Sequence, residues 1–284
     1  MSKLENFLTK SEVMSLKNMQ KAMFQNQITV TCVGLYNHGK STLLNVLIKD
    51  FKYKTFKTAD ARETTLNKTV VYNDIMYVDT PGLNAQYDDD NKVMEAIENS
   101  DITLFVHTIT TGEFNKKEIE FLTQIQKHWK NPQEFIERTI FVLSRIDNIE
   151  NREDIEKTKN KMQEQIKEIF NSNCLTIPIS SADYKDGMID NEEELISESN
   201  IKILEKEIAL LSKKSKESII KTKRKRFEYK FYELQLKLNQ KLKINQEKIE
   251  ELKVEKKKQN KEFKNDISKI ERTLENMYSK LERI

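Results

Sequence analysis

Glycine and proline, the residues that most often interrupt a helix, are confined to one part of the chain. All five glycines and all three prolines lie between Gly34 and Gly187, so residues 188–284 contain neither. We therefore expect long helices after residue 187. With 284 residues, 37% of them hydrophobic and 33% charged, the chain can form one ordinary core and leave many charged residues for solvated helix.

Short apolar runs alternate with amphipathic stretches between residues 28 and 179, which predicts an α/β fold with a doubly wound sheet. The expected strands are 28–33, 69–72, 75–79, 102–106, 139–143 and 174–179, and the expected helices are 41–48, 90–99, 116–130 and 154–170. Residues 3–26 have an apolar period near 3.6 and predict another amphipathic helix. We thus expect three domains: an N-terminal helix packing with the tail (1–27), the α/β domain (28–190) and a helical-bundle or coiled-coil arm (191–284).

The arm carries two apolar stripes. Phe227, Phe231, Leu234 and Leu238 begin the first, and the second has strict four- and three-residue spacing at Phe263, Ile267, Ile270, Leu274, Met277, Leu281 and Ile284. Such spacing is typical of a coiled-coil or bundle seam. Because the two stripes differ in phase and residues 255–262 are almost wholly polar, we expect a hairpin or kink within 253–261. One continuous helix is the alternative.

Charge divides the chain in the same way. From residue 200 onward there are 25 Lys and Arg against 14 Asp and Glu, whereas residues 1–199 hold 24 against 32. A basic arm suits phospholipid headgroups, RNA or an acidic protein, or is simply a solvated helix. The basic stretch 213–226 and the aromatic residues after it either form a patch that faces lipid or RNA, or are a bundle seam flanked by solvated lysines. The seam spacing favours the second interpretation.

Residues 34–41 read Gly-Leu-Tyr-Asn-His-Gly-Lys-Ser, which matches the phosphate-binding pattern Gly-x-x-x-x-Gly-Lys-Ser/Thr between an expected strand and an expected helix. Backbone N–H groups would face the phosphates, Lys40 would reach the β- and γ-phosphates, and the Ser41 hydroxyl would ligate Mg²⁺. The side chain of His38 either shields the γ-phosphate or packs, and we favour packing. The residues expected to contact nucleotide here are Gly34, Asn37, His38, Gly39, Lys40, Ser41 and Thr42.

A second motif, Asp79-Thr80-Pro81-Gly82, follows an apolar strand 38 residues after Ser41. An aspartate at a strand end would hold Mg²⁺ through water, and the Gly82 amide would sense the γ-phosphate. Small GTPases place a threonine between two such motifs to close a loop over the metal, and the resemblance implies this role for Thr65, or alternatively Thr64. The predicted metal ligands are therefore Ser41, Thr65 and Asp79.

A third motif, Ser144-Arg145-Ile146-Asp147, follows the strand 139–143. It resembles the Asn/Thr-Lys-x-Asp motif of GTPases. The resemblance implies that Asp147 accepts hydrogen bonds from guanine N1 and N2 and that the stem of Arg145 covers the face of the base. Ser181 and Ala182 follow the last expected strand and resemble the Ser-Ala loop of GTPases, which implies an amide that reaches guanine O6. Ser144, Arg145, Asp147, Ser181 and Ala182 are therefore the predicted base-binding residues.

These four ordered motifs resemble the translation-factor-related P-loop GTPases. Residues 79–122 more specifically resemble bacterial dynamin-like proteins of the labile-enterotoxin-output type, through Asp-Thr-Pro-Gly-Leu-Asn-Ala at 79–85, Val106-His107 and Thr111-Gly112-Glu113. The resemblance implies a hydrolase that binds GTP or GDP with Mg²⁺. It also implies that a helix before the domain packs with helices after it, and that nucleotide state controls the arm or self-assembly.

The hydrolysis mechanism is expected to differ from that of Ras-like enzymes. Leu83 stands where those enzymes carry the glutamine that orients the attacking water. Asn37 matches the asparagine of GTPases that bind K⁺ beside the phosphates, so we expect acceleration by K⁺, by self-association across the nucleotide face, or by both. The expected catalytic residues are Asn37, Lys40, Ser41 and Thr65.

Three functions stay open: a GTP hydrolase in the manner of dynamin-like proteins, a regulatory GTPase that binds RNA or a ribosome through its arm, and a nucleotide-binding scaffold with negligible turnover. The two cysteines, Cys32 and Cys174, lack metal-like spacing and suit a reducing compartment, so we expect a cytoplasmic protein with possible peripheral membrane contact. His107 and His128 are expected to be structural, and no metal-binding cluster is expected.

Overall fold

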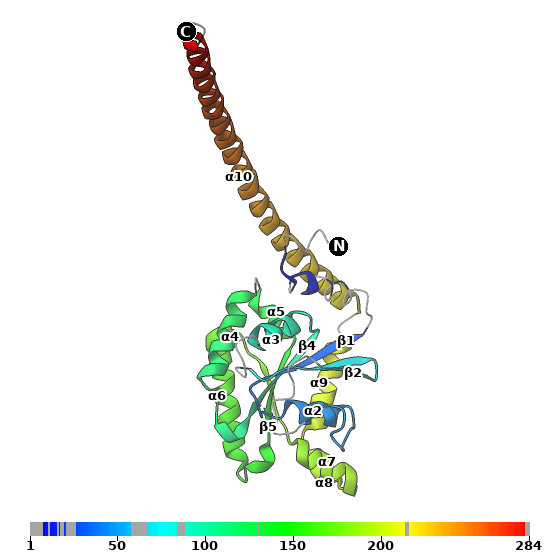
Figure 1. Cartoon of the computed structure of the whole chain (residues 1–284). Coiled ribbons are helices and arrows are strands. Elements are labelled where there is room, and N and C mark those ends of the chain that lie inside the picture. Colours follow the sequence, from blue (N-terminus) through cyan, green and yellow to red (C-terminus); the bar gives the residue numbers. More distant parts are fainter. Residues whose placement is uncertain are drawn as a thin grey trace. The chain divides into compact units, whose positions relative to one another are not determined.

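The computed structural model describes residues 8–10, 12–15, 17, 20, 27–57, 68–83, 89–129, 131–213 and 216–281. They fall into two compact units, one of Lys17–Phe227 and one of Met1–Leu16 with Glu228–Ile284. Within the described residues, none of the helices combines the length and the apolar character that a membrane crossing requires. The predicted α/β fold is confirmed for the larger unit (Figure 1).

A six-stranded sheet in the order β2-β3-β1-β4-β5-β6 forms the centre of this unit. Its strands are β1 (Ile28–Val33), β2 (Lys68–Tyr72), β3 (Ile75–Asp79), β4 (Ile102–Thr108), β5 (Thr139–Ser144) and β6 (Leu175–Pro178). β2 pairs antiparallel with β3, and all other pairs are parallel. The central strands are rich in β-branched and aromatic residues, which favour extended structure. The chain order reverses at β1, which lies between β3 and β4, and such a switch point is where open α/β sheets bind ligands.

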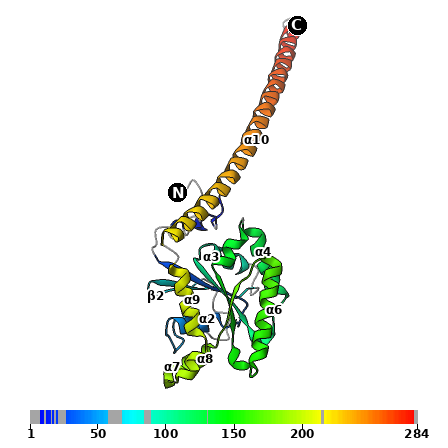
Figure 2. The same cartoon turned by 180° about the vertical axis from the view of Figure 1, so that it is seen from behind.

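Helices cover both faces of the sheet (Figures 1 and 2). They are α2 (Lys40–Leu47), α3 (Asp89–Glu98), α4 (Lys116–His128), α5 (Pro132–Glu137), α6 (Arg152–Phe170), α7 (Ser181–Asp190), α8 (Glu193–Glu198) and α9 (Ile201–Lys213). Side chains of α2, α7, α8 and α9 share one apolar cluster with the strands, and those of α3, α4, α5 and α6 share the other. Alternate residues of β5, such as Ile140 and Phe141, enter opposite clusters, as the two-residue period of a strand requires.

Helix α9 extends the compact unit beyond the expected boundary at residue 190. Ile201, Leu204 and Ile208 repeat at helical spacing and are fully or almost fully buried against the sheet. Burying one such side chain stabilises the fold by roughly 1.5–3 kcal/mol. The short helices α5 and α7 were not predicted, and the helix expected at 116–130 ends at His128 because Pro132 begins α5.

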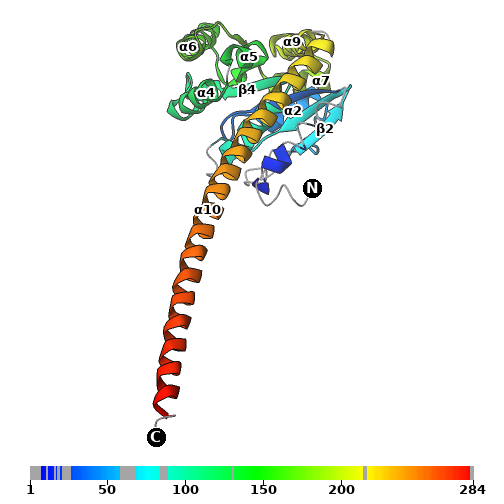
Figure 3. The same ribbon diagram turned by 90° about the horizontal axis from the view of Figure 1, so that it is seen from above.

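Helix α10 runs unbroken over Lys216–Leu281, 66 residues (Figure 3). The hairpin or kink expected within 253–261 is therefore wrong, and the alternative of one continuous helix holds. The polar residues there are mostly lysine, glutamate and glutamine, which are good helix formers and need no buried face to remain helical.

In the smaller unit, the N-terminal residues pack on α10. Leu8, Val13 and Leu234 are buried together with Leu238 beside them, and Lys237 forms an ion pair with Glu12. The remainder of the predicted helix at 3–26 lies largely outside the described residues. The described part supports the expectation that the N-terminal segment packs with the tail.

The first turns of α10 are fixed by buried charges within the larger unit. Lys223 Nζ lies 2.8 Å from Asp101 Oδ2, with the two side chains only 7% and 4% exposed. The same Asp101 oxygen accepts from the Thr29 N–H at 2.9 Å, and Lys223 also donates to the Gln27 carbonyl at 3.3 Å. Asp101 therefore ties the start of α10 to the start of β1.

We predict that Asp101→Asn lowers the free energy of unfolding by about 3–5 kcal/mol, because it leaves the Lys223 ammonium buried without its counter-charge. Urea unfolding followed by circular dichroism measures the change. Glu250→Gln is the matched control: it breaks the pair with Lys253, whose side chains are 63% and 70% exposed, and should change stability by less than about 1 kcal/mol. Equal effects of the two variants would contradict this account.

Candidate functional site: the phosphate loop and its neighbours

The loop from Gly34 to Gly39 connects β1 to α2, with residues 34–41 at the switch point of the sheet. Gly34 has φ +148°, and a Cβ there would lie 2.1 Å from the Val106 carbonyl oxygen, so only glycine fits against β4. Gly39 has φ +89°, a left-handed conformation that directs the chain into α2. The glycines of the motif thus shape the loop in the way the pattern predicts.

Lys40 is the first residue of α2 and is buried. Its Nζ donates to the Leu35 carbonyl at 2.9 Å, which holds the ammonium over the loop. Burial lowers the pKa of Lys40, while the charge of Asp79 opposes that change. A phosphate in the loop would place negative charge beside this ammonium and favour its protonated form.

Ser41 and Asp79, two of the three predicted metal ligands, come from different motifs and are brought together. The Ser41 hydroxyl donates to Asp79 Oδ2 at 2.7 Å. Asp79 is 2% exposed, and its Oδ1 has no hydrogen-bond partner among the described residues. Burial raises the pKa of Asp79, although the Ser41 hydrogen bond and the charge of Lys40 oppose this. A hydroxyl beside a buried carboxylate oxygen without a partner fits a hard cation such as Mg²⁺.

The turn after Asp79 is hydrogen-bonded to the phosphate loop. Thr80 Oγ1 donates to the Cys32 carbonyl at 2.8 Å, and the Leu83 N–H donates to the Gly34 carbonyl at 3.1 Å. A Cβ on Gly82 would lie 2.8 Å from Tyr36 Cα, so glycine is required for this close approach. Leu83 is buried at 2% exposure in the apolar core, as befits a leucine at this position.

The third motif contacts the phosphate loop from β5. Ser144 Oγ donates to the His38 carbonyl at 2.8 Å, and Arg145 donates to the Asn37 carbonyl at 2.7 Å. Asp147 lies in a short 3₁₀ turn with its side chain exposed. Ser144 and Arg145 therefore fix the turn that presents Asp147, although neither matches the usual GTPase motif.

The predicted Ser-Ala loop lies beside this turn. The Ile146 N–H donates to the Ile179 carbonyl at 3.3 Å, which links the Asp147 turn to the segment that enters α7. Ser181 and Ala182 are the first two residues of α7, and Ser180 caps the helix by accepting from the Asp183 N–H. Backbone N–H groups in a first helical turn have no partner within the helix, so they are available to an acceptor such as a carbonyl oxygen.

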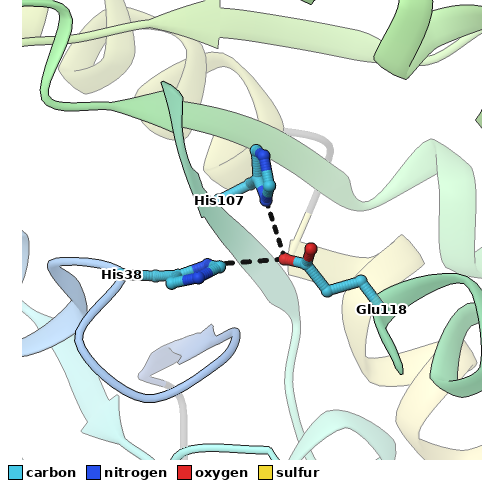
Figure 4. Close-up of side chains that lie close together, drawn as sticks. All are labelled: His38, His107 and Glu118. Carbon is cyan, nitrogen blue, oxygen red and sulfur yellow. Dashed lines mark hydrogen bonds and ion pairs between the residues drawn. The ribbon is translucent and has the colours of Figure 1, made fainter. Parts of the chain in front are cut away.

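The side chain of His38 lies at the back of the loop and is 6% exposed (Figure 4). It faces His107 on β4 and Glu118 on α4, in agreement with the packing role that we favoured for it. Sequence analysis missed Glu118. The pattern Asn-x-x-Glu at 115–118 does signal a helix start, and Asn115 and Glu118 form a capping box, but nothing in the pattern points to the histidines.

Glu118 is a buried carboxylate held by two imidazoles. Its Oε1 lies 2.8 Å from His107 Nδ1 and 3.4 Å from His38 Nδ1. Burial alone would raise the pKa of Glu118, but the histidines on either side outweigh it and lower the pKa to about 2. The third histidine, His128, is the last residue of α4 and pairs with Glu98.

Thr65, the third predicted metal ligand, and its alternative Thr64 lie outside the described residues.

The mixed sheet, the phosphate loop at its switch point and the Ser41–Asp79 pair together have the architecture of a P-loop GTPase fold. The family model described as 50S ribosome-binding GTPase matches residues 29–145, from β1 to Arg145 in the third motif. This match supports the predicted class of protein, a GTPase. The match ends before Asp147, α6, β6 and the helices that follow β6.

Two curated relatives each match somewhat more than three fifths of the chain. An uncharacterized protein of Acinetobacter baylyi is 31% identical over 176 residues, 61% of this chain and 39% of that protein. The tRNA modification GTPase MnmE of Pseudothermotoga lettingae is 27% identical over 190 residues, 64% of this chain and 38% of MnmE. The chain thus spans about two fifths of the length of these relatives.

Among solved structures, the LeoA bacterial dynamin GTPase from ETEC matches with a TM-score of 0.54 at 12% identity. It covers 75% of this chain and 45% of LeoA. At this identity the likeness supports the fold.

We predict that Gly82→Ala weakens binding of a fluorescent guanine nucleotide about tenfold or more, because the added methyl group must displace the Tyr36 backbone. Overpacking of this kind costs about 1–3 kcal/mol. Fluorescence titration measures the affinity, with thermal unfolding to check the fold. Asp74→Gly is the control, because it lies at the other end of β3 in a turn with φ 62° that glycine adopts readily. Unchanged affinity in Gly82→Ala would show that nucleotide binding does not depend on the close contact between Gly82 and the Tyr36 backbone.

Proposed function

We propose that this protein hydrolyses GTP to GDP and phosphate with Mg²⁺ held by Ser41 and Asp79. The observation that carries the proposal is the 2.7 Å contact between these two side chains beside the phosphate loop. Mg²⁺ bound there would neutralise charge on the β- and γ-phosphates, and Lys40 would contribute a second positive charge. Thr65 would complete the metal site when the loop containing it closes.

Guanine recognition follows from the third motif. Asp147 is exposed and carries two acceptor oxygens, which suit the N1 and N2 donors of guanine. The hydrogen bonds of Ser144 and Arg145 to the phosphate loop couple the base site to the phosphate site. Amides at Ser181 and Ala182 would bind guanine O6.

The attacking water would be activated without a glutamine from the second motif, because Leu83 is buried in the core. Asn37 has an exposed side chain on the loop, with φ 62°, and its amide oxygen is a suitable ligand for K⁺. K⁺ beside the phosphates would supply the charge that an arginine finger supplies in other GTPases. Self-association across the nucleotide face is a second way to supply such a charge.

The second half of α10 carries an exposed apolar stripe, whose pairing the nucleotide state would control. Five apolar residues on α10 are 40–66% exposed and follow four- and three-residue spacing: Phe263, Ile267, Ile270, Leu274 and Met277. A stripe of this kind favours pairing with another helix. We propose that the arm mediates self-assembly in the manner of dynamin-like proteins, in the cytoplasm or at a membrane surface.

A second candidate is a regulatory GTPase that binds RNA or a ribosome through the basic arm. The description of the matching family, 50S ribosome-binding GTPase, and the excess of Lys and Arg after residue 200 favour it. Binding of labelled RNA that falls steeply with salt would support this candidate, because neutralised phosphates release counterions. Sedimentation with anionic liposomes instead would support the first candidate.

We predict that GTP turnover is faster in KCl than in NaCl at matched ionic strength and that Asn37→Ala removes this difference. Phosphate release measures the turnover rates. Equal rates in the two salts, unaffected by protein concentration, would overturn the K⁺ and self-association proposals.

We also predict that Asp79→Asn lowers turnover by about 10²-fold or more in either salt, because the buried carboxylate that would hold Mg²⁺ loses its charge. The same assay measures this change, with ATP in place of GTP as the control for base recognition. If bound GTP is not turned over by the wild type, the proposal of hydrolysis is overturned.

We predict that Ile267→Lys combined with Leu274→Lys abolishes self-association of the full chain, since two charges would enter the seam. Sedimentation velocity over a range of protein concentrations, with GDP and with a GTP analogue, measures the oligomer. Asn265→Lys with Ser268→Lys adds the same charge away from the seam and should associate as the wild type does. A wild type that stays monomeric with both nucleotides would contradict assembly through the arm.

A further inference from the structure

Three metal-ligating side chains meet behind the phosphate loop, although they are far apart in the sequence. His38 comes from the loop, His107 from β4 and Glu118 from the first turn of α4 (Figure 4). One ligand atom from each lies within 4.8 Å of the other two, and the residues are 6%, 0% and 0% exposed. No metal-binding cluster stands out in the sequence. The sheet brings these three side chains together, and their spacing along the chain gives no sign of it.

The ligand atoms of His107 and Glu118 are each oriented by a second contact. His107 Nε2 donates to the Gly112 carbonyl at 2.7 Å, which leaves Nδ1 to face Glu118. Glu118 Oε2 accepts from the Asn115 N–H at 3.1 Å, which leaves Oε1 to face both histidines. Metal-binding histidines characteristically donate their other ring N–H to a carbonyl or carboxylate in this way, and metal-binding carboxylates are similarly hydrogen-bonded.

His38 provides the observation that points to a ligand. Its Nδ1 is buried and, among the residues that the structure describes, forms no hydrogen bond of good geometry. It lies 3.4 Å from Glu118 Oε1. Two ligands of a tetrahedral zinc ion with bonds of 2.0–2.1 Å are about 3.3 Å apart, so the separation of this one pair matches that of two zinc ligands. The shorter 2.8 Å from His107 Nδ1 to the same oxygen is a hydrogen-bond distance, and an ion would take the place of the proton between them.

We propose that His38 Nδ1, His107 Nδ1 and Glu118 Oε1 bind one divalent transition-metal ion of the zinc class. Two imidazoles and one carboxylate are a set that Zn²⁺ accepts, with a fourth position for water. Mg²⁺ prefers oxygen ligands, so this site is chemically distinct from the pair Ser41 and Asp79. Because its ligands are buried, the ion would be retained through purification unless it is chelated.

Such an ion would join the phosphate loop to β4 and α4 through a side chain next to Asn37. It would restrict the loop to one conformation, so that nucleotide and metal affinity become coupled. Coupling of this kind is reciprocal: if zinc changes nucleotide affinity by some factor, nucleotide changes zinc affinity by the same factor. The site is thus a candidate regulatory element for the loop, and its existence does not depend on GTP turnover.

The experiment is zinc titration of the full chain after chelation, followed by calorimetry and by competition with a chromophoric chelator. We expect one equivalent for the wild type, and at least tenfold weaker binding for His38→Asn and for His107→Asn. The chain has only three histidines and two cysteines, so the controls are His128→Asn and Cys174→Ser, which should bind as the wild type does. Circular dichroism checks that each variant folds.

A measurement on the wild type keeps the proposal testable if a variant fails to fold. Co²⁺ in place of zinc should give the intense visible absorption of a four-coordinate site, and added zinc should remove it. No zinc binding by the wild type, or wild-type affinity in folded His38→Asn and His107→Asn, would overturn the proposal. The cluster would then be a buried ion pair between His107 and Glu118 alone.

Discussion

The parallel pairing of β1 with β3 is the constraint on which the site depends. Its register places Cys32 opposite Asp79, so the loop that begins at Gly34 and the turn that begins at Thr80 leave the sheet side by side. Ser41 can then reach Asp79 across 38 residues of sequence. The hydrogen bonds from Thr80 to the Cys32 carbonyl and from Leu83 to the Gly34 carbonyl follow from the same pairing. Strand register thus converts two separate motifs into one site.

Much of this arrangement is predictable from sequence because each motif carries its own local geometry. A glycine-rich loop after a β-branched strand, or an aspartate at a strand end, indicates where the side chain will lie once the sheet is parallel. Ser144 and Arg145 show the limit of motif matching. They depart from the expected residues, yet both hydrogen-bond to carbonyls of the phosphate loop, which a search for identical letters does not reveal.

Other features depend on tertiary contacts or on their absence. Glu118 contacts two histidines only because α4 begins beside the end of β4. The spacing of these residues in the sequence does not indicate that contact. Helix α5 is too short for its apolar period to stand out. In α10 the change of stripe phase suggested a break, but a solvated helix of good helix formers needs no constant apolar phase, and hydrogen bonding along the backbone continues through the polar stretch.

The unbroken length of α10 has a mechanical meaning. At 1.5 Å per residue, its 66 residues extend for about 100 Å. Lys223 and Arg226 anchor its first turns to the Ser100–Asp101 turn and to Glu134, while most of its remaining length consists of exposed side chains. A rotation of a rod displaces each point in proportion to its distance from the pivot. For any helix of this length, a few degrees of rotation about one end correspond to several ångströms at the other end.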